Sequence, residues 1–248
     1  MGKARRTRQT REQERKRART RRMLIATGTA IAVVVALIVV QQVTSNGSGK
    51  PDPSNLAGVA DVQTQFSGVD ESAGTISKPG ANPNVTITEF GDLRCPVCRQ
   101  FDAEVTPRLI DDFVRTGKAK MRFRTWPILG TNSVTAAQAA YAAQQQNALW
   151  RYATLTYLNQ GDETVSWFTP AFARAVAAGV GLDIAKFDRD RASAAADAEI
   201  AKVRAEASAA GFGGTPSIRV TGPKGTITVD ADYDAIASGV QKVSGTAA

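Results

Sequence analysis

Eighteen consecutive uncharged residues, from Met23 to Val40, divide this chain into two parts of different character. As an α-helix such a run is ~27 Å long, close to the ~30 Å hydrocarbon core of a bilayer. The next charged residue is Lys50, so the helix can continue to Val43. The sequence therefore predicts a transmembrane helix over residues 23–43.

The distribution of charge orients this helix. Residues 1–22 contain 11 basic and 2 acidic residues, whereas the rest of the chain contains 20 basic and 21 acidic residues. Basic flanks stay on the cytoplasmic side of a membrane. We therefore expect a cytoplasmic tail and an extracytoplasmic bulk. Because the net charge of +8 is confined to the tail, we expect it to contact anionic lipid rather than nucleic acid.

Other interpretations of the apolar run compete with an uncleaved anchor. A cleaved signal peptide needs small residues at its cleavage site, and residues 40–43 contain only Val and Gln. Arg21 and Arg22 resemble a twin-arginine export signal, although a doubled arginine is expected by chance in so basic a tail. The basic flank disfavours a buried core helix. The single-pass anchor is the favoured interpretation.

The chain has two cysteines and no histidine, which excludes several chemistries. A Ser-His-Asp or Cys-His catalytic pair cannot form. A histidine-ligated metal site is excluded too, and two cysteines alone cannot complete a four-coordinate zinc site within one chain. We therefore expect no metal and no cofactor other than a disulfide between the two cysteines.

The first half of the remaining chain shows strand and helix patterns. Residues 44–58 are predicted to be a flexible linker, and residues 59–84 to hold one short strand and turns. The clearer predictions are a strand at Val85–Phe90, a helix from Cys95 to about Arg115 that Pro107 kinks, and a strand at Lys120–Trp126.

The second half begins with an Ala- and Gln-rich block. Residues 133–209 are predicted to form three or four helices, broken near Gly161, Gly179–Gly181 and Gly211. Two short strands and a helix follow, at Ser217–Val220, Thr226–Val229 and Asp232–Val243. The order β-α-β, helical block, β-β-α predicts an α/β fold with one mixed sheet and a helical insertion.

Cys95-Pro96-Val97-Cys98 lies where the first clear strand has ended and a helix begins. Free N–H groups and the helix dipole at such a position stabilise a thiolate, which is the form of cysteine that attacks disulfides. Pro96 falls at the first helical position, where a missing N–H does no harm. One helical turn brings Cys98 within bonding reach of Cys95. Flanking Arg94 and Arg99 add positive charge.

A purely structural disulfide is the alternative for this motif. A bridge that closes a loop of two intervening residues stabilises little through chain entropy. The redox interpretation is therefore favoured.

A second segment, Gly214-Thr215-Pro216-Ser217, opens the C-terminal hairpin, and its proline lies 121 residues after Cys95. Taken alone it could be an ordinary turn. Together with residues 89–98, Phe101, Gly117 and the 150–161 segment, it resembles the thioredoxin superfamily, and closely its DsbA-like branch of bacterial extracytoplasmic thiol oxidoreductases. The resemblance covers roughly residues 75–245.

The resemblance implies a thioredoxin-like fold and assigns roles to several residues. It implies a cis bond before Pro216 beside the cysteine pair, with Thr215 against the sulfurs and Gly214 in the substrate-binding segment. It implies that Glu89 is a buried acid that shuttles the proton of the second cysteine; an ordinary strand-end carboxylate is the alternative. Many family oxidants carry His where this chain has Val97, so a less oxidising pair is expected.

The predicted divisions are a cytoplasmic tail (1–22), a transmembrane signal anchor (23–43), a linker and pre-strand (44–74), the first half of the thioredoxin-like domain (75–130), a helical insertion (131–210) and the second half (211–248).

The function expected from the resemblance is donation of the Cys95–Cys98 disulfide to reduced exported proteins. The resemblance also implies a membrane quinone-linked partner that reoxidises the pair. Alternatives are a thiol reductase or disulfide isomerase of the same fold, and a client-binding module or membrane scaffold without catalytic activity.

Overall fold

The computed structural model describes residues 52–245. The predicted tail (1–22), the predicted anchor (23–43) and the first part of the predicted linker lie outside this range. Within it, the structure contains no helix that is both long enough and apolar enough to span a bilayer.

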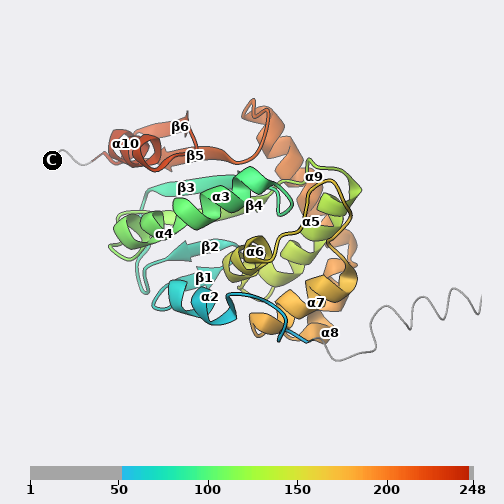
Figure 1. The fold of residues 1–248 in the computed structure, drawn as a ribbon. Coiled ribbons are helices and arrows are strands. Elements are labelled where there is room, and N and C mark those ends of the chain that lie inside the picture. The colour runs from blue at the N-terminus through green and yellow to red at the C-terminus, as the bar shows by residue number, and fades with distance from the viewer. Residues whose placement is uncertain (1–51, 246–248) are drawn as a thin grey trace, which may run out of the picture. The chain divides into compact units, whose positions relative to one another are not determined.

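A six-stranded mixed sheet forms the centre of the fold (Figure 1). The strands across it are β1 (Asp70–Ser72), β2 (Thr75–Ser77), β4 (Lys120–Thr125), β3 (Thr86–Gly91), β5 (Ser217–Gly222) and β6 (Gly225–Val229). Only β3 and β4 run parallel; every other neighbouring pair is antiparallel. The predicted mixed sheet is confirmed.

Helices connect and cover these strands. They are α2 (Val59–Gln65), α3 (Pro96–Glu104), α4 (Thr106–Leu109), a π-helical turn η1 (Ile110–Val114), α5 (Thr131–Gln144), α6 (Leu149–Leu158), α7 (Pro170–Gly179), α8 (Ile184–Arg191), α9 (Ala194–Ala209) and α10 (Tyr233–Val243). Helices α5 to α9 form the predicted insertion between β4 and β5, and in Figure 1 most of them lie to the right of the sheet.

The helix that follows the cysteine motif is interrupted, as the position of Pro107 predicts. Helix α3 ends at Glu104, and Val105 departs from ideal helical geometry with φ −108° before α4 begins. Proline lacks an N–H and its ring crowds the preceding turn, so a straight helix cannot pass through it. The chain continues through α4 and η1 to Val114, close to the predicted end.

The insertion holds five helices, one more than the upper limit of the prediction. The breaks near Gly161, Gly179 and Gly211 are present, but two others carry no glycine. Asn147 adopts φ 56° between α5 and α6, in the left-handed region that asparagine tolerates. Helix α8 ends at Arg191, and Ser193 then caps α9, because its hydroxyl accepts from the Ala196 N–H.

The prediction for residues 59–84 is wrong. This segment forms helix α2 and two strands, so helix and strand already lie within the predicted linker and pre-strand (44–74). The β1–β2 hairpin turns at Ala73 (φ 47°) and Gly74 (φ 75°). Each strand is only three residues long, and β2 is held by pairing with β4, Ile76 opposite Met121. Such short strands carry no periodic signal of their own.

Strand β3 presents different side chains to its two faces because neighbouring residues alternate. Ile87 belongs to the main core, which also contains the two cysteines. Phe90 points the other way and packs against Val203 and Ala207 of α9. Glu89, next to Phe90, therefore lies on the side of the sheet that α3 covers.

Candidate active site

The two cysteines occupy the start of helix α3. Cys95 is the N-cap residue with extended backbone (φ −76°, ψ 121°), Pro96 is the first helical residue, and the Cys95 carbonyl accepts from the Arg99 N–H at 3.1 Å. Both sulfurs are free thiols; Cys95 is 7% exposed and Cys98 is completely buried. Cys95 is therefore the more accessible of the two.

The segment from distant sequence lies against Cys95. The Thr215–Pro216 peptide is cis, and the Cys95 thiol donates to the Thr215 carbonyl at 3.4 Å. Antiparallel pairing explains this approach: β5 starts at Ser217 opposite Phe90, so its beginning lies at the end of β3 that leads to Cys95. Gly214 precedes Thr215 in the chain, and its carbonyl accepts from the Ser217 hydroxyl at 2.6 Å.

Hydrogen bonds lower the pKa of Cys95 to about 6. The largest contribution is the hydrogen bond from Cys98, and it outweighs the opposing effect of burial; the Thr215 side chain and the N–H groups of Cys98 and Val97 contribute further. Within residues 52–245 the buried Thr215 hydroxyl has no hydrogen-bond partner. At pH 7 a group with a pKa near 6 is ~90% ionised, so the Cys95 sulfur is mainly a thiolate, the form that attacks disulfides.

The pKa of Cys98 shifts in the opposite direction. Burial raises its pKa well above the usual range, and the hydrogen bond to Cys95 and the charge on Cys95 raise it further. The reduced pair is therefore one thiolate and one thiol, with the proton on the buried sulfur.

Glu89 lies in the interior beside this pair. It is 2% exposed, and neither carboxyl oxygen has a hydrogen-bond partner within the described residues. Burial raises its pKa well above the usual range, with added repulsion from Asp102 and Cys95. Its charge in turn raises the pKa of Cys98, so the two groups interact. The raised pKa keeps the Glu89 carboxyl mainly neutral near pH 7.

Asp92, to which the sequence analysis gave no role, holds the turn before the cysteines. Its carboxylate accepts from the Arg94 N–H at 2.9 Å and from the Ser133 hydroxyl at 2.9 Å. It also accepts from the N–H groups of Ile128 and Leu129, at 2.8 and 3.1 Å. One buried carboxylate thus joins the cysteine turn to the segment that enters the insertion.

Arg94 does not have the predicted role of a positive charge directed at the sulfurs. Its side chain is buried and donates to the carbonyls of Leu129, Glu163 and Val165, at 3.1, 2.6 and 2.7 Å. It is not among the groups that shift the pKa of Cys95. Arg94 therefore positions the loop between α6 and α7 beside the cysteines.

Two residues of the insertion contact the same turn. The Gln160 amide donates to the carbonyls of Leu93 and Cys95, at 3.0 and 3.2 Å. The Tyr157 hydroxyl donates to the Asp92 carbonyl at 3.2 Å. Both lie in the 150–161 segment that carries part of the family resemblance, but spacing alone does not show what their side chains contact.

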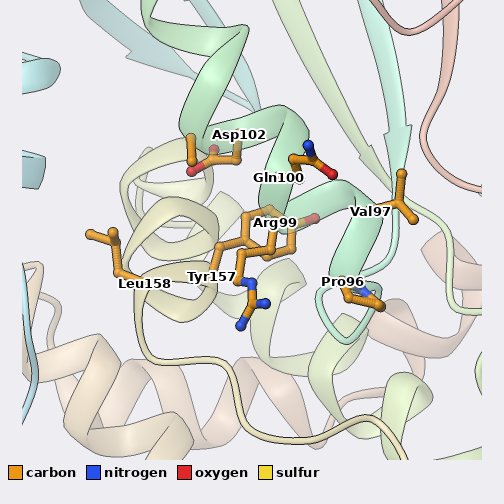
Figure 2. Close-up of a pocket in the computed structure, with 8 residues that line it drawn as sticks. Pro96, Val97, Arg99, Gln100, Asp102, Tyr157 and Leu158 are labelled. Atoms are coloured by element: carbon orange, nitrogen blue, oxygen red, sulfur yellow. The ribbon is translucent and has the colours of Figure 1, made fainter.

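A pocket of about 520 Å³ adjoins the cysteine motif on the side of α6 (Figure 2). It is lined by Pro96, Val97, Arg99, Gln100, Asp102, Ala103, Tyr157 and Leu158. Val97 is 57% exposed, so it lies at the surface beside the sulfurs. Across residues 52–245 there is no cluster of three or more cysteine and acidic side chains that could hold a metal ion.

The structure thus brings together Cys95, Cys98, Glu89, Thr215 and Pro216, from three separate parts of the chain. A family model described as Thioredoxin matches residues 79–237. The chain belongs to this thioredoxin family. It is similar to several curated proteins and solved structures.

Three relatives illustrate this similarity. A "Probable disulfide bond formation protein D" of Bacillus cereus is 28% identical over 162 residues, which cover 64% of this chain and 73% of the relative. The thioredoxin-like oxidoreductase from Silicibacter pomeroyi has a solved structure that is 28% identical, with a TM-score of 0.57, covering 75% of this chain and 98% of that one. Oxidised BdbD from Bacillus subtilis shares the fold, with a TM-score of 0.60 at 23% identity. The match covers 70% of this chain and 95% of the BdbD chain.

Proposed function

We propose that this member of the thioredoxin family is a membrane-anchored thiol–disulfide oxidase that works outside the cytoplasm and donates its Cys95–Cys98 disulfide to reduced exported proteins. The observation that carries the proposal is the asymmetry of the cysteine pair: an accessible sulfur with a lowered pKa beside a buried sulfur with a raised one. The names of the relatives, disulfide bond formation proteins, support the same activity.

The exchange proceeds in two steps. A client thiolate attacks the Cys95 sulfur of the disulfide, which forms a mixed disulfide and breaks the bond to Cys98. The leaving Cys98 thiolate takes a proton, for which neutral Glu89 is the nearby donor. A second client thiolate then attacks the client sulfur of the mixed disulfide and releases Cys95 as a thiolate. The client gains a disulfide, and the pair gains two electrons.

The electrostatics favour this direction. Stabilising the Cys95 thiolate stabilises the reduced pair, which makes the disulfide a stronger oxidant. A thiolate with a low pKa is also a good leaving group in the second step. Reductase and isomerase activity remain alternatives, because Val97 supplies no positive charge between the cysteines.

The location outside the cytoplasm rests on the uncharged run at 23–43 and the basic tail before it. Tethering in the membrane plane raises the effective concentration of a membrane partner. We propose a quinone-linked membrane protein as the partner that reoxidises the pair. The predicted divisions at residues 1–22 and 23–43 belong to this proposal.

Oxidative refolding tests the activity. The full chain in detergent should restore the activity of reduced ribonuclease A, and Cys95→Ser should abolish this. When it is incubated with a client that already contains a disulfide, Cys98→Ser should accumulate a mixed disulfide, because the Cys95 thiolate attacks the client disulfide and no second sulfur in the enzyme can resolve the product. If Cys95→Ser refolds the client as fast as the parent chain, the protein is a binding module and not an oxidase.

The redox potential tests the direction. Equilibration with glutathione buffers should give a value well above the ~−270 mV of thioredoxin. A value at or below that level would identify a reductase. The anchor is tested separately: carbonate washing should leave the full chain in the membrane fraction and release a chain that lacks residues 1–43.

A further inference from the structure

The pocket beside the cysteine motif combines apolar surface with an available cation (Figure 2). Leu158 is 47% exposed and Val97 is 57% exposed; within residues 52–245 only Ile128 and Val165 are comparably exposed among large hydrophobic residues. Exposed apolar side chains that gather in a hollow mark an interaction surface more often than scattered ones.

Arg99 is the cation of this pocket. Figure 2 shows its side chain between Leu158 on one side and Pro96 on the other. It is exposed and makes no side-chain hydrogen bond or ion pair with any residue in the described range. Neighbouring arginines are engaged: Arg94 binds three carbonyls, and Arg108 lies 3.7 Å above the Tyr233 ring.

The other polar groups of the pocket already have partners. The Gln100 amide donates to Glu104. The Asp102 carboxyl is buried and accepts from the Thr154 hydroxyl at 2.8 Å, and burial raises its pKa to about 7. The Tyr157 hydroxyl donates to the Asp92 carbonyl. Arg99 is therefore the group whose charge is left for a ligand.

The pocket is continuous with the proposed site of disulfide exchange. Pro96 and Val97 line it and directly follow Cys95, whose thiol donates to the Thr215 carbonyl, and Thr215 is not among the residues that line the pocket. A client whose sulfur reaches Cys95 has one flank at Thr215. At ~3.3 Å per extended residue, its other flank passes over the start of α3 and into the pocket within a few residues.

We propose that this pocket binds the client segment next to the reacting cysteine, and that Arg99 selects segments in which an acidic residue accompanies an apolar one. The apolar side chain packs on Leu158 and the carboxylate pairs with the Arg99 guanidinium. This inference rests on the proposed function, because it assigns a substrate class to the same exchange reaction.

The test is a competition between short single-cysteine peptides. Three peptides carry Leu-Glu, Leu-Lys or Ser-Glu beside the cysteine, and the rate of mixed-disulfide formation with the oxidised full chain in detergent is followed by mass spectrometry. We expect about a threefold preference for Leu-Glu over Leu-Lys, the size of an exposed ion pair. The ratio cancels any change in the reactivity of Cys95 itself.

Variants identify the residue responsible. Arg99→Glu should invert the Leu-Glu to Leu-Lys ratio. Leu158→Ser should abolish the preference for Leu-Glu over Ser-Glu and keep the charge preference. Lys202→Glu, the same charge change at an exposed position of α9, should leave both ratios as in the parent chain.

Two outcomes overturn the proposal and point to different causes. If all peptides react but Arg99→Glu leaves the charge ratio unchanged, the pocket does not select the client, and the proposed function stands. If no peptide forms a mixed disulfide with the parent chain, the proposed function fails together with this inference.

Discussion

The Cys95 sulfur lies 3.4 Å from the carbonyl oxygen of Thr215, a residue 120 positions away in the chain. The thiol can donate to this oxygen, but the thiolate cannot, so ionisation removes that bond. The Thr215 hydroxyl is buried without another partner and can then donate to the charged sulfur. One threonine thus contacts both protonation states of Cys95.

The pH dependence of alkylation tests the asymmetry of the pair. Iodoacetamide reacts with thiolates, so modification of Cys95 in the reduced chain should rise with a midpoint at about pH 6. Cys98 should remain unmodified up to pH 9, because burial raises its pKa and blocks access. Peptide mapping distinguishes the two. A midpoint near 8.5 for Cys95 would contradict the assigned hydrogen bonds.

Thr215→Val tests the hydroxyl at nearly constant volume. The thiolate loses a donor, so the pKa of Cys95 should rise by about one unit, or ~1.4 kcal/mol. Alkylation at pH 6 should slow accordingly. Thr221→Val is the matched control, since that exposed hydroxyl bonds to the Thr226 hydroxyl of the neighbouring strand β6. An unchanged midpoint in Thr215→Val would remove Thr215 from the site.

Glu89→Gln should increase stability at neutral pH. A carboxyl with a raised pKa in the folded state contributes stability below its unfolded pKa of ~4.3, and this is lost as pH rises through the folded pKa. In the disulfide form, where no thiolate titrates, the parent chain should lose unfolding free energy above pH ~4.3. The loss is ~1.4 kcal/mol for each unit by which the folded pKa is raised. Urea unfolding at pH 4 and pH 7.5 should show a smaller loss in Glu89→Gln.

The same substitution should slow the reaction. Glutamine cannot give a proton to the leaving Cys98, so mixed-disulfide formation should fall about 100-fold if Glu89 acts as a general acid. Glu89→Asp keeps a carboxyl and should recover part of the rate. A Glu89→Gln variant that reacts like the parent chain would leave Glu89 as a buried carboxyl without a role in proton transfer.

Arg94→Met should destabilise the fold. Three carbonyls lose a charged donor, and at the magnitudes typical of such bonds we expect a loss of about 2–4 kcal/mol. Limited proteolysis should cut first in the loop between α6 and α7. Arg115→Met, which removes a partly exposed arginine bonded to Asp111 and to two carbonyls of the α2 region, should leave that loop protected.

Sequence patterns predicted the parts of this fold that depend on local signals. Strand β3, the interruption near Pro107 and the cysteine motif at a helix start each follow from neighbouring residues. The β1–β2 hairpin did not, because its stability comes from pairing with β4, more than 40 residues later. The break between α5 and α6 at Asn147 was also not predicted, because Asn147 lies among several other polar residues and the pattern does not single it out.

In the candidate site, too, some residues were predicted from the sequence and others were not. Cys95, Cys98, Glu89, Thr215 and Pro216 were proposed from motif and resemblance. The contacts of Asp92 and Gln160 were not, because they join the cysteine turn to the insertion. For Arg94 the sequence suggested a charge beside the sulfurs, whereas the fold turns its side chain toward buried carbonyls.

Strand β3 places an acid and an aromatic ring side by side on opposite faces. A slip of one residue in its pairing would exchange them, with a ring beneath the sulfurs and a carboxyl against the apolar surface of α9. The exchange would destabilise both faces of the sheet. The alternation that places the Glu89 carboxyl on the face of the cysteine pair therefore also protects the sheet against misaligned pairing.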